Sequence, residues 1–130
     1  MAGKVMAQQI CLDTSICIEL LRENQALVDK VKEFGEATPN IATITVFELL
    51  QRTFNVSAAE EFIADAILLN FDEKAARKAS DIEKELKHRG IMIGRQDIFI
   101  GAIAIVNNCA LATLNAKDFS KIKGLKLVKI

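Results

Sequence analysis

The feature that most constrains this chain is a regular alternation of short apolar runs with longer amphipathic stretches. The apolar runs are four or five residues long, and we expect them to form strands at residues 9–12, 41–44, 67–71, 110–113 and 126–130. The intervening stretches predict helices at residues 15–22, 24–34, 45–53, 72–88 and 96–107, with one more beginning at residue 57. Strands that alternate with helices favour a parallel sheet covered on both faces. The expected fold is therefore α/β, a three-layer α/β/α sandwich with a short-stranded parallel sheet.

Local signals indicate where several of the helices begin and end. Thr45 with Glu48, and Ser57 with Glu60, have the spacing of a capping box, in which the first residue caps the helix and the fourth reaches back to it. Four further residues mark helix ends: Asn24 and Asp72 as N-caps, and Gly35 and Gly90 as stop signals.

Length and composition favour one cytoplasmic domain. The chain has 130 residues, of which 51% are hydrophobic, so residues 1–130 are expected to form a single domain with residues 1–8 as a loose N-terminal extension. Three cysteines are too few for a disulfide-stapled secreted fold, and the first eight residues lack the apolar segment of a signal peptide. The uncharged stretch 98–116 contains two asparagines, so we interpret it as a core helix and a strand rather than a membrane span.

The formal net charge is zero, but the charges are unevenly distributed. Residues 1–65 contain 5 basic and 10 acidic side chains, whereas residues 66–130 contain 12 and 7. Much of the positive charge lies in residues 74–95, where acidic residues alternate with it. Such a stretch is either an ordinary solvated helix face or a surface that binds a polyanion, and composition alone leaves both interpretations open.

Five acidic or amide side chains stand where strands are expected to end or helices to begin: Asp13, Glu48, Asp97, Asn115 and Asp118. Each has a structural explanation on its own, as a helix cap or as an acid in a first helical turn. Together they point to one place, because the carboxyl ends of parallel strands share one edge of a sheet. Carboxylates that converge there would repel one another unless a cation lay among them. Oxygen-rich sets of this kind suit Mg²⁺ or Mn²⁺.

Residues and motifs for other kinds of catalysis are few in this sequence. His88, the single histidine, lies near a helix end and suits a helix-terminal cation better than a base. Cys11, Cys17 and Cys109 have no histidine at catalytic or zinc-binding spacing, and we expect them to fill the core. The phosphate-binding, dinucleotide-binding and serine-hydrolase motifs are all missing from the sequence.

Four segments in this order resemble the PIN-domain ribonucleases, and in particular the small VapC-type toxins of toxin–antitoxin pairs. They are ICLDTSICIE at residues 10–19, ITVFEL at 44–49, IGRQDI at 93–98 and LATLNAKDF at 111–119. The segment NFDEKAAR at residues 70–77 also looks like the link between two family helices. The resemblance extends from about residue 9 to residue 130.

The resemblance assigns roles to individual residues. It implies that Asp13, Glu48 and Asp97 bind metal and act in catalysis, with Thr14 or Ser15 and Thr113 as supporting hydroxyls. At position 115 many family members have aspartate, whereas this chain has asparagine. Asn115 would then contribute an uncharged ligand and Asp118 would supply or share the fourth acidic role. One or two Mg²⁺ or Mn²⁺ ions are compatible with that set.

The activity implied by the resemblance is metal-dependent endonucleolytic hydrolysis of RNA, with tRNA or another structured RNA as candidate substrate. The implied partners are a second copy of the chain and a small antitoxin, as in a VapBC-type pair, and no membrane. The basic stretch then becomes a weak candidate for RNA binding through Lys84, Lys87, Arg89 and Arg95. The apolar residues of the helices near 15–21 and 46–50 exceed what one core face needs, so they indicate either an interface or deeper burial.

Three alternatives remain at this stage. A haloacid-dehalogenase-like phosphatase needs a second aspartate two residues after the first, where this chain has Ser15. A receiver-like signalling domain also gathers acids at a sheet edge, but it places an aspartate after a central strand near the position of Glu48. The third alternative is a non-toxin or degenerate PIN domain that binds RNA or a partner without cleaving RNA.

Overall fold

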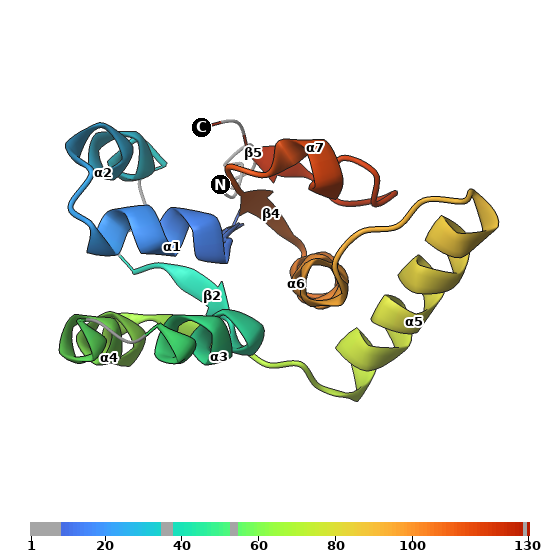
Figure 1. Ribbon diagram of the computed structural model, residues 1–130, viewed down its shortest axis with the longest axis horizontal. Helices are drawn as coiled ribbons and strands as arrows, with labels where there is room; N and C mark the ends of the chain where they lie inside the picture. Colours follow the sequence, from blue (N-terminus) through green and yellow to red (C-terminus); the bar gives the residue numbers. More distant parts are fainter. Residues whose placement is uncertain (1–8, 35–37, 53–54, 129) are drawn as a thin grey trace, which may run out of the picture.

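The computed structural model describes residues 9–34, 38–52, 55–128 and 130, and within these the chain forms one α/β unit (Figure 1). The expected extension at residues 1–8, the stop signal at Gly35 and the expected helix end at Thr53 lie outside the described residues. The sheet has five parallel strands in the order β3-β2-β1-β4-β5. The strands are β1 (Gln9–Leu12), β2 (Asn40–Ala42), β3 (Ile67–Leu69), β4 (Cys109–Ala112) and β5 (Leu127–Val128).

The order of the strands creates one switch point in the sheet, where the direction in which strands are added reverses. From β1 the chain adds β2 and β3 on one side, and then returns to the other side of β1 with β4. β1 and β4 pair in register, with Cys11 beside Leu111 and Leu12 beside Ala112. Ligand sites in open parallel sheets lie beyond the carboxyl ends of the strands at such a switch point. The loops after Leu12 and Ala112 are therefore where a site is expected.

Side chains that alternate along the strands separate the core into two layers. On β1, Ile10 and Leu12 face one buried cluster and Cys11 faces the other. The first cluster is covered by α1 (Thr14–Leu21), α2 (Gln25–Lys32), α3 (Thr43–Gln51) and α4 (Val56–Asp65). The second is covered by α5 (Glu73–His88), α6 (Arg95–Val106) and α7 (Ala116–Phe119). Figure 1 shows α1, α2 and α4 on the opposite side from α5 and α6. The three-layer α/β/α sandwich is confirmed.

Both predicted capping boxes are wrong. α3 begins at Thr43, directly after β2, so Thr45 lies inside the helix and the predicted strand 41–44 is too long. The hydroxyl of Thr45 lies 3.0 Å from Thr14 Oγ1 instead of capping the helix. α4 begins at Val56 after Asn55, whose φ of 60° is left-handed, and Ser57 again lies inside the helix. At α3 the helix follows β2 with no loop between them, so the strand determines where the helix starts.

The other local signals are confirmed where the structure describes them. Asn24 and Asp72 cap α2 and α5 through backbone N–H groups three residues later, at 3.3 Å and 3.0 Å. Gly90 follows α5 with a φ of 71°, which glycine adopts without strain. α6 is buried on nearly all sides, and the three cysteines are buried thiols in the core, as expected. No helix in the described part of the chain is long and apolar enough to cross a membrane.

Candidate active site

Asp13 stands at the switch point, between the end of β1 and the start of α1. It is only 4% exposed, and three donors hold its carboxylate. The backbone N–H of Thr14 donates to Oδ1 at 2.7 Å, while the hydroxyls of Ser15 and Thr113 donate to Oδ2 at 3.0 Å and 2.6 Å. The predicted supporting residues Thr14, Ser15 and Thr113 therefore all contact Asp13. Three donors leave this buried carboxylate little rotational freedom.

The same hydroxyls join the loop after β1 to the loop after β4. Ser15 Oγ accepts the backbone N–H of Leu114 at 3.1 Å, and Thr113 Oγ1 accepts that of Asn115 at 2.9 Å. The backbone N–H of Asp13 in turn donates to the carbonyl oxygen of Ala112 at 2.9 Å. Each hydroxyl therefore fixes the Asp13 carboxylate and the backbone of the neighbouring loop at once.

Glu48 reaches the site from α3. Thr14 Oγ1 donates to Glu48 Oε1 at 2.6 Å, so Thr14 contacts two of the predicted carboxylates. Behind Thr14 lies Thr45, which is fully buried. Thr45 was predicted from its spacing to Glu48 to be a helix cap and not a residue of the site. The useful signal was the spacing, since residues 45 and 48 of one helix share a face.

Asp97 lies in the first turn of α6 and is half-buried. Burial, and after it the negative charges of Asp13, Glu48 and Asp118, together raise the pKa of Asp97 from 3.8 to about 6. The amide of Asn115 opposes the rise by donating from Nδ2 to Asp97 Oδ2 at 3.3 Å. These influences place the four predicted acids in one neighbourhood.

Asn115 joins two acids as a donor. Its Nδ2 also lies 3.2 Å from Asp118 Oδ2, so one amide group bridges Asp97 and Asp118. For the ligand role implied by the resemblance, the amide oxygen Oδ1 would have to face the acids instead. A side-chain amide offers both kinds of group at its end, so a half-turn exchanges them.

Positive charge is sparse around these acids. Asp13, Glu48 and Asp97 form no ion pair with any residue that the structure describes. Asp118 has one distant partner, Lys121, whose Nζ lies 3.9 Å from Oδ1. The donors to the predicted acids are otherwise neutral hydroxyl and amide groups. Such donors orient a carboxylate but leave its negative charge uncompensated.

The chemistry of this donor set fits a hard divalent cation, although the side chains do not stand as a finished ligand set. Within residues 9–34, 38–52, 55–128 and 130, no three histidine, cysteine or acidic side chains are arranged to hold a metal ion. The oxygens instead accept from the hydroxyls and the amide described above. Oxygen ligands from a few carboxylates, with uncompensated charge, are what Mg²⁺ and Mn²⁺ bind.

Comparison with known proteins decides the family. The sequence profile of the PIN domain matches residues 10–125, which include every predicted site residue. The chain belongs to the PIN-domain family. Membership excludes the phosphatase and receiver alternatives, which are different families.

Several relatives of this PIN domain are VapC proteins. The tRNA(fMet)-specific endonuclease VapC of Shigella flexneri is 26% identical over 122 residues, covering 88% of this chain and 92% of the relative. Ribonuclease VapC3 of Methanocaldococcus jannaschii is 34% identical over 93 residues, covering 71% of this chain and 94% of the relative. The crystal structure of VapBC2 from Rickettsia felis bound to a promoter DNA fragment aligns with a TM-score of 0.83 at 24% identity, over 93% of this chain and 98% of that one. This last likeness shows the fold.

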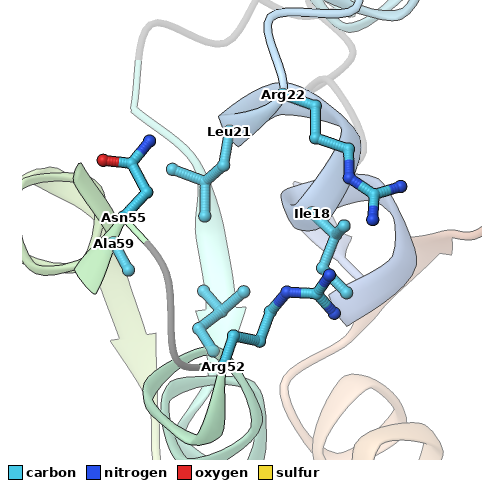
Figure 2. A pocket seen from close by; sticks show the side chains of 7 residues that line it. Ile18, Leu21, Arg22, Arg52, Asn55 and Ala59 are labelled. Carbon is cyan, nitrogen blue, oxygen red and sulfur yellow. The ribbon is translucent and has the colours of Figure 1, made fainter.

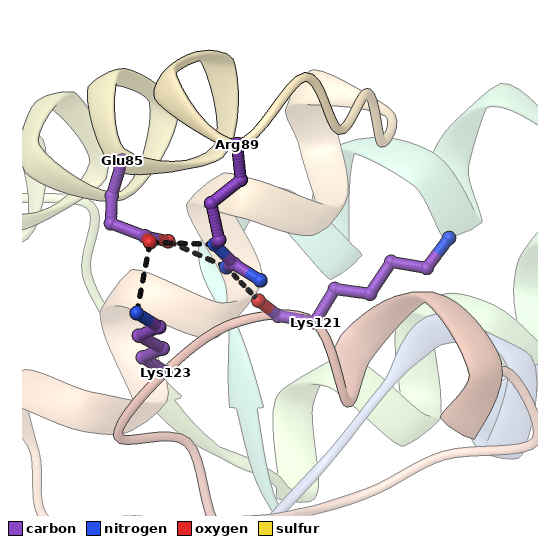
Figure 3. A network of polar contacts seen from close by, with 4 residues as sticks. All are labelled: Glu85, Arg89, Lys121 and Lys123. Carbon is purple, nitrogen blue, oxygen red and sulfur yellow. Dashed lines mark hydrogen bonds and ion pairs between the residues drawn. The ribbon is translucent and has the colours of Figure 1, made fainter.

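Of the four basic residues predicted to bind RNA, two lie on α5, one directly follows it and Arg95 begins α6, and three of the four are in ion pairs. Lys87 and Arg95 both contact Glu83, at 3.3 Å and 3.0 Å. Arg89 donates from Nε to Glu85 at 2.6 Å and from Nη2 to the carbonyl oxygen of Lys121 at 2.6 Å (Figure 3). Arg89 therefore ties α5 to the turn after α7 in this PIN domain. The RNA-binding role of Lys84, Lys87, Arg89 and Arg95 stays a prediction.

Among the extra apolar residues of α1 and α3, some are buried in the core and others are exposed or line a surface groove. Ile16 and Leu49 are buried, whereas Leu50 is 38% exposed, and the apolar Phe54 that follows α3 lies outside the described residues. A groove with a cavity of about 30 Å³ lies between α1, α3 and α4 of this PIN domain. Its lining is mostly apolar, with two guanidinium groups at its rim (Figure 2): Ile18, Leu21, Arg22, Leu49, Arg52, Asn55 and Ala59.

Proposed function

We propose that this PIN domain is an endoribonuclease that hydrolyses RNA phosphodiesters with Mg²⁺ or Mn²⁺, and that it acts as the toxin of a VapBC-type toxin–antitoxin pair. One observation carries the proposal. Acids from four elements meet at the carboxyl edge of the sheet, and the three at Asp13, Glu48 and Asp97 have only neutral donors among the described residues. The names of the VapC relatives supply the substrate class, which is RNA.

Each site residue has a defined task in this proposal. Asp13, Glu48 and Asp97 hold one or two divalent ions, with Asn115 as an uncharged fourth ligand. A bound ion would activate water for attack on phosphorus and neutralise charge on the phosphodiester. Asp118 acts beside them as the fourth acid and accepts the amide of Asn115. Thr14, Ser15 and Thr113 hold the carboxylates in place, so little reorganisation is needed when the substrate arrives.

The proposed partners follow from the surface and from the relatives. The structural relative from Rickettsia felis was determined as VapBC2, and we infer that this chain likewise binds a small antitoxin. The groove between α1, α3 and α4 supports such a contact, since it combines apolar side chains with Arg22 and Arg52. A second copy of the chain, and tRNA or another structured RNA as substrate, complete the proposal, with the cytoplasm as its location.

Cleavage of a mixed pool of tRNA and other structured RNAs, in Mg²⁺, Mn²⁺ or EDTA, tests the activity. The wild type should cleave with a divalent ion and not in EDTA. Asp13→Asn and Asp97→Asn should each lower the rate at least about a hundredfold, because each removes a charged ligand. Asp65→Asn, which changes an exposed carboxylate at the end of α4, is the matched control and should cleave normally.

Two results would contradict the proposal. Cleavage that persists in EDTA or in both site variants would show that the chemistry lies elsewhere. A wild type that binds Mn²⁺ but cleaves no RNA in the pool would favour a PIN domain that binds without cutting.

A further inference from the structure

Thr45 is a buried polar residue that is neither a proposed metal ligand nor one of the residues proposed to hold the carboxylates. Its side chain is fully buried in α3, and its hydroxyl lies 3.0 Å from Thr14 Oγ1. A threonine inside a helix commonly turns its hydroxyl back to the carbonyl four residues earlier. The hydroxyl of Thr45 instead meets a side chain from α1, 31 positions away in the sequence.

Counting protons gives this contact a direction. A hydroxyl has one proton to donate and can accept from other donors. An ionised carboxylate only accepts, so the proton of Thr14 is committed to Glu48 Oε1, 2.6 Å away. Thr45 must then be the donor in its contact with Thr14. The hydrogen bonds run in one direction, from Thr45 to Thr14 and from Thr14 to Glu48.

Thr14 is the point at which this chain of hydrogen bonds meets the rest of the site. Its backbone N–H holds Asp13 Oδ1 at 2.7 Å, while its hydroxyl holds Glu48. Losing the donor from Thr45 would free the hydroxyl of Thr14 to rotate toward other acceptors, among which Asp13 is the nearest along the chain. The orientation of Glu48 relative to Asp13 would then depend on Thr45, which is not among the hydrogen-bond donors to either carboxylate.

The chain of hydroxyls also suits a carboxylate that has to bind a cation. An arginine or lysine in the place of Thr14 would neutralise Glu48 and compete with a metal ion. Two neutral hydroxyls in series fix the carboxylate and leave its charge in place.

We propose that Thr45 is a positioning residue for Glu48, acting through the hydroxyl of Thr14. The proposal rests on the proposed function, because it assigns Thr45 to the same divalent-ion site. Outer-shell hydrogen bonds of this kind orient metal-binding carboxylates and alter metal affinity.

The test compares Thr45→Val, which replaces the hydroxyl by a methyl group of similar size, with Thr45→Ser, which keeps the hydroxyl. Thr43→Val is the matched control, since Thr43 lies on the same helix and its hydroxyl accepts from the backbone N–H of Phe71 instead. Mn²⁺ affinity is measured by calorimetry, RNA cleavage by kcat and KM, and folding by urea denaturation. The carboxyl ¹³C signal of Glu48 in the metal-free protein reports its hydrogen bonding directly.

We expect Thr45→Val to shift the Glu48 carboxyl signal and to weaken Mn²⁺ binding about threefold to tenfold, the range of one hydrogen bond. The value of kcat should fall by a similar factor with KM for RNA unchanged. Thr45→Ser should restore all three quantities, and Thr43→Val should match the wild type in them even where it unfolds at lower urea.

Two results would overturn the role of Thr45. One is a Glu48 signal and Mn²⁺ affinity in Thr45→Val equal to those of the wild type. The other is a loss in Thr45→Ser as large as in Thr45→Val, which would assign the effect to packing. If the wild type cleaves no RNA, the proposed function fails, but the Glu48 signal and Mn²⁺ affinity still decide the role of Thr45.

Discussion

At the scale of single residues, the candidate site is held together by neutral hydrogen-bond donors. Hydroxyls of Ser15 and Thr113 and the backbone of Thr14 hold Asp13, while the amide of Asn115 bridges Asp97 and Asp118. A neutral donor stabilises the ionised form of an acid only modestly. Burial of Asp97 and repulsion from the other carboxylates therefore both act in the folded protein, and together they raise the pKa of Asp97.

The pKa of Asp97 in the metal-free protein is expected to be about 6. Asn115→Asp should raise it further, because the substitution removes a donor to Asp97 and adds a negative charge next to it. Asn107→Asp, which adds the same charge beyond the other end of α6, is the control and should leave the pKa of Asp97 unchanged. Titration of the Asp97 carboxyl carbon by NMR without divalent ions measures its pKa in the wild type and in both variants. An equal or lower pKa in Asn115→Asp would contradict this account.

At the scale of elements, helix ends could be predicted where no contact with a distant segment competed with the local capping signal. Asp72 caps α5 as expected, since its side chain lies at the start of the helix and accepts the backbone N–H of Ala75. At α3 the spacing of Thr45 and Glu48 gave the wrong start. There the helix follows β2 after Ala42, and both side chains interact with Thr14.

The cap of α5 can be tested by stability alone. Asp72→Ala should lower the free energy of unfolding by about 1 kcal/mol, because the backbone N–H of Ala75 loses its acceptor. Asp72→Asn keeps an acceptor oxygen and should lose only a few tenths of a kcal/mol. Urea denaturation at pH 7 compares the two. Equal losses in both variants would point to the charge at the helix N-terminus rather than to the cap.

At the scale of the whole molecule, the burial of Asp97 and repulsion from its neighbouring acids couple stability to pH and to divalent ions. The folded protein binds a proton at Asp97 with a pKa of about 6, whereas the ordinary value is 3.8. The protonated acid is therefore favoured by folding. The contribution of Asp97 to stability is present below about pH 4 and is lost as pH rises through 6. A divalent ion bound by the acids would reverse that loss at neutral pH.

Comparison of the wild type with Asp97→Asn isolates this contribution from all other acids. Without divalent ions, the variant should be the more stable protein above pH 6, and the difference should shrink toward pH 4. Adding Mn²⁺ at pH 7.5 should raise the urea midpoint of the wild type and leave that of the variant nearly unchanged. A variant that is less stable than the wild type at pH 7.5 without metal would contradict the raised pKa.

The sequence by itself determined the class of fold and the neighbourhood of Asp13, Glu48 and Asp97. These follow from local pattern, because strand and helix periods set the layers, and parallel strands bring their carboxyl ends to one edge. Tertiary structure alone decided where α3 begins, that Thr45 contacts Thr14, and that Arg89 joins the turn after α7. The contact between Thr45 and Thr14 and the contact between Arg89 and Lys121 each join segments about thirty positions apart. No local preference encodes such a contact, since it exists only after the layers have packed.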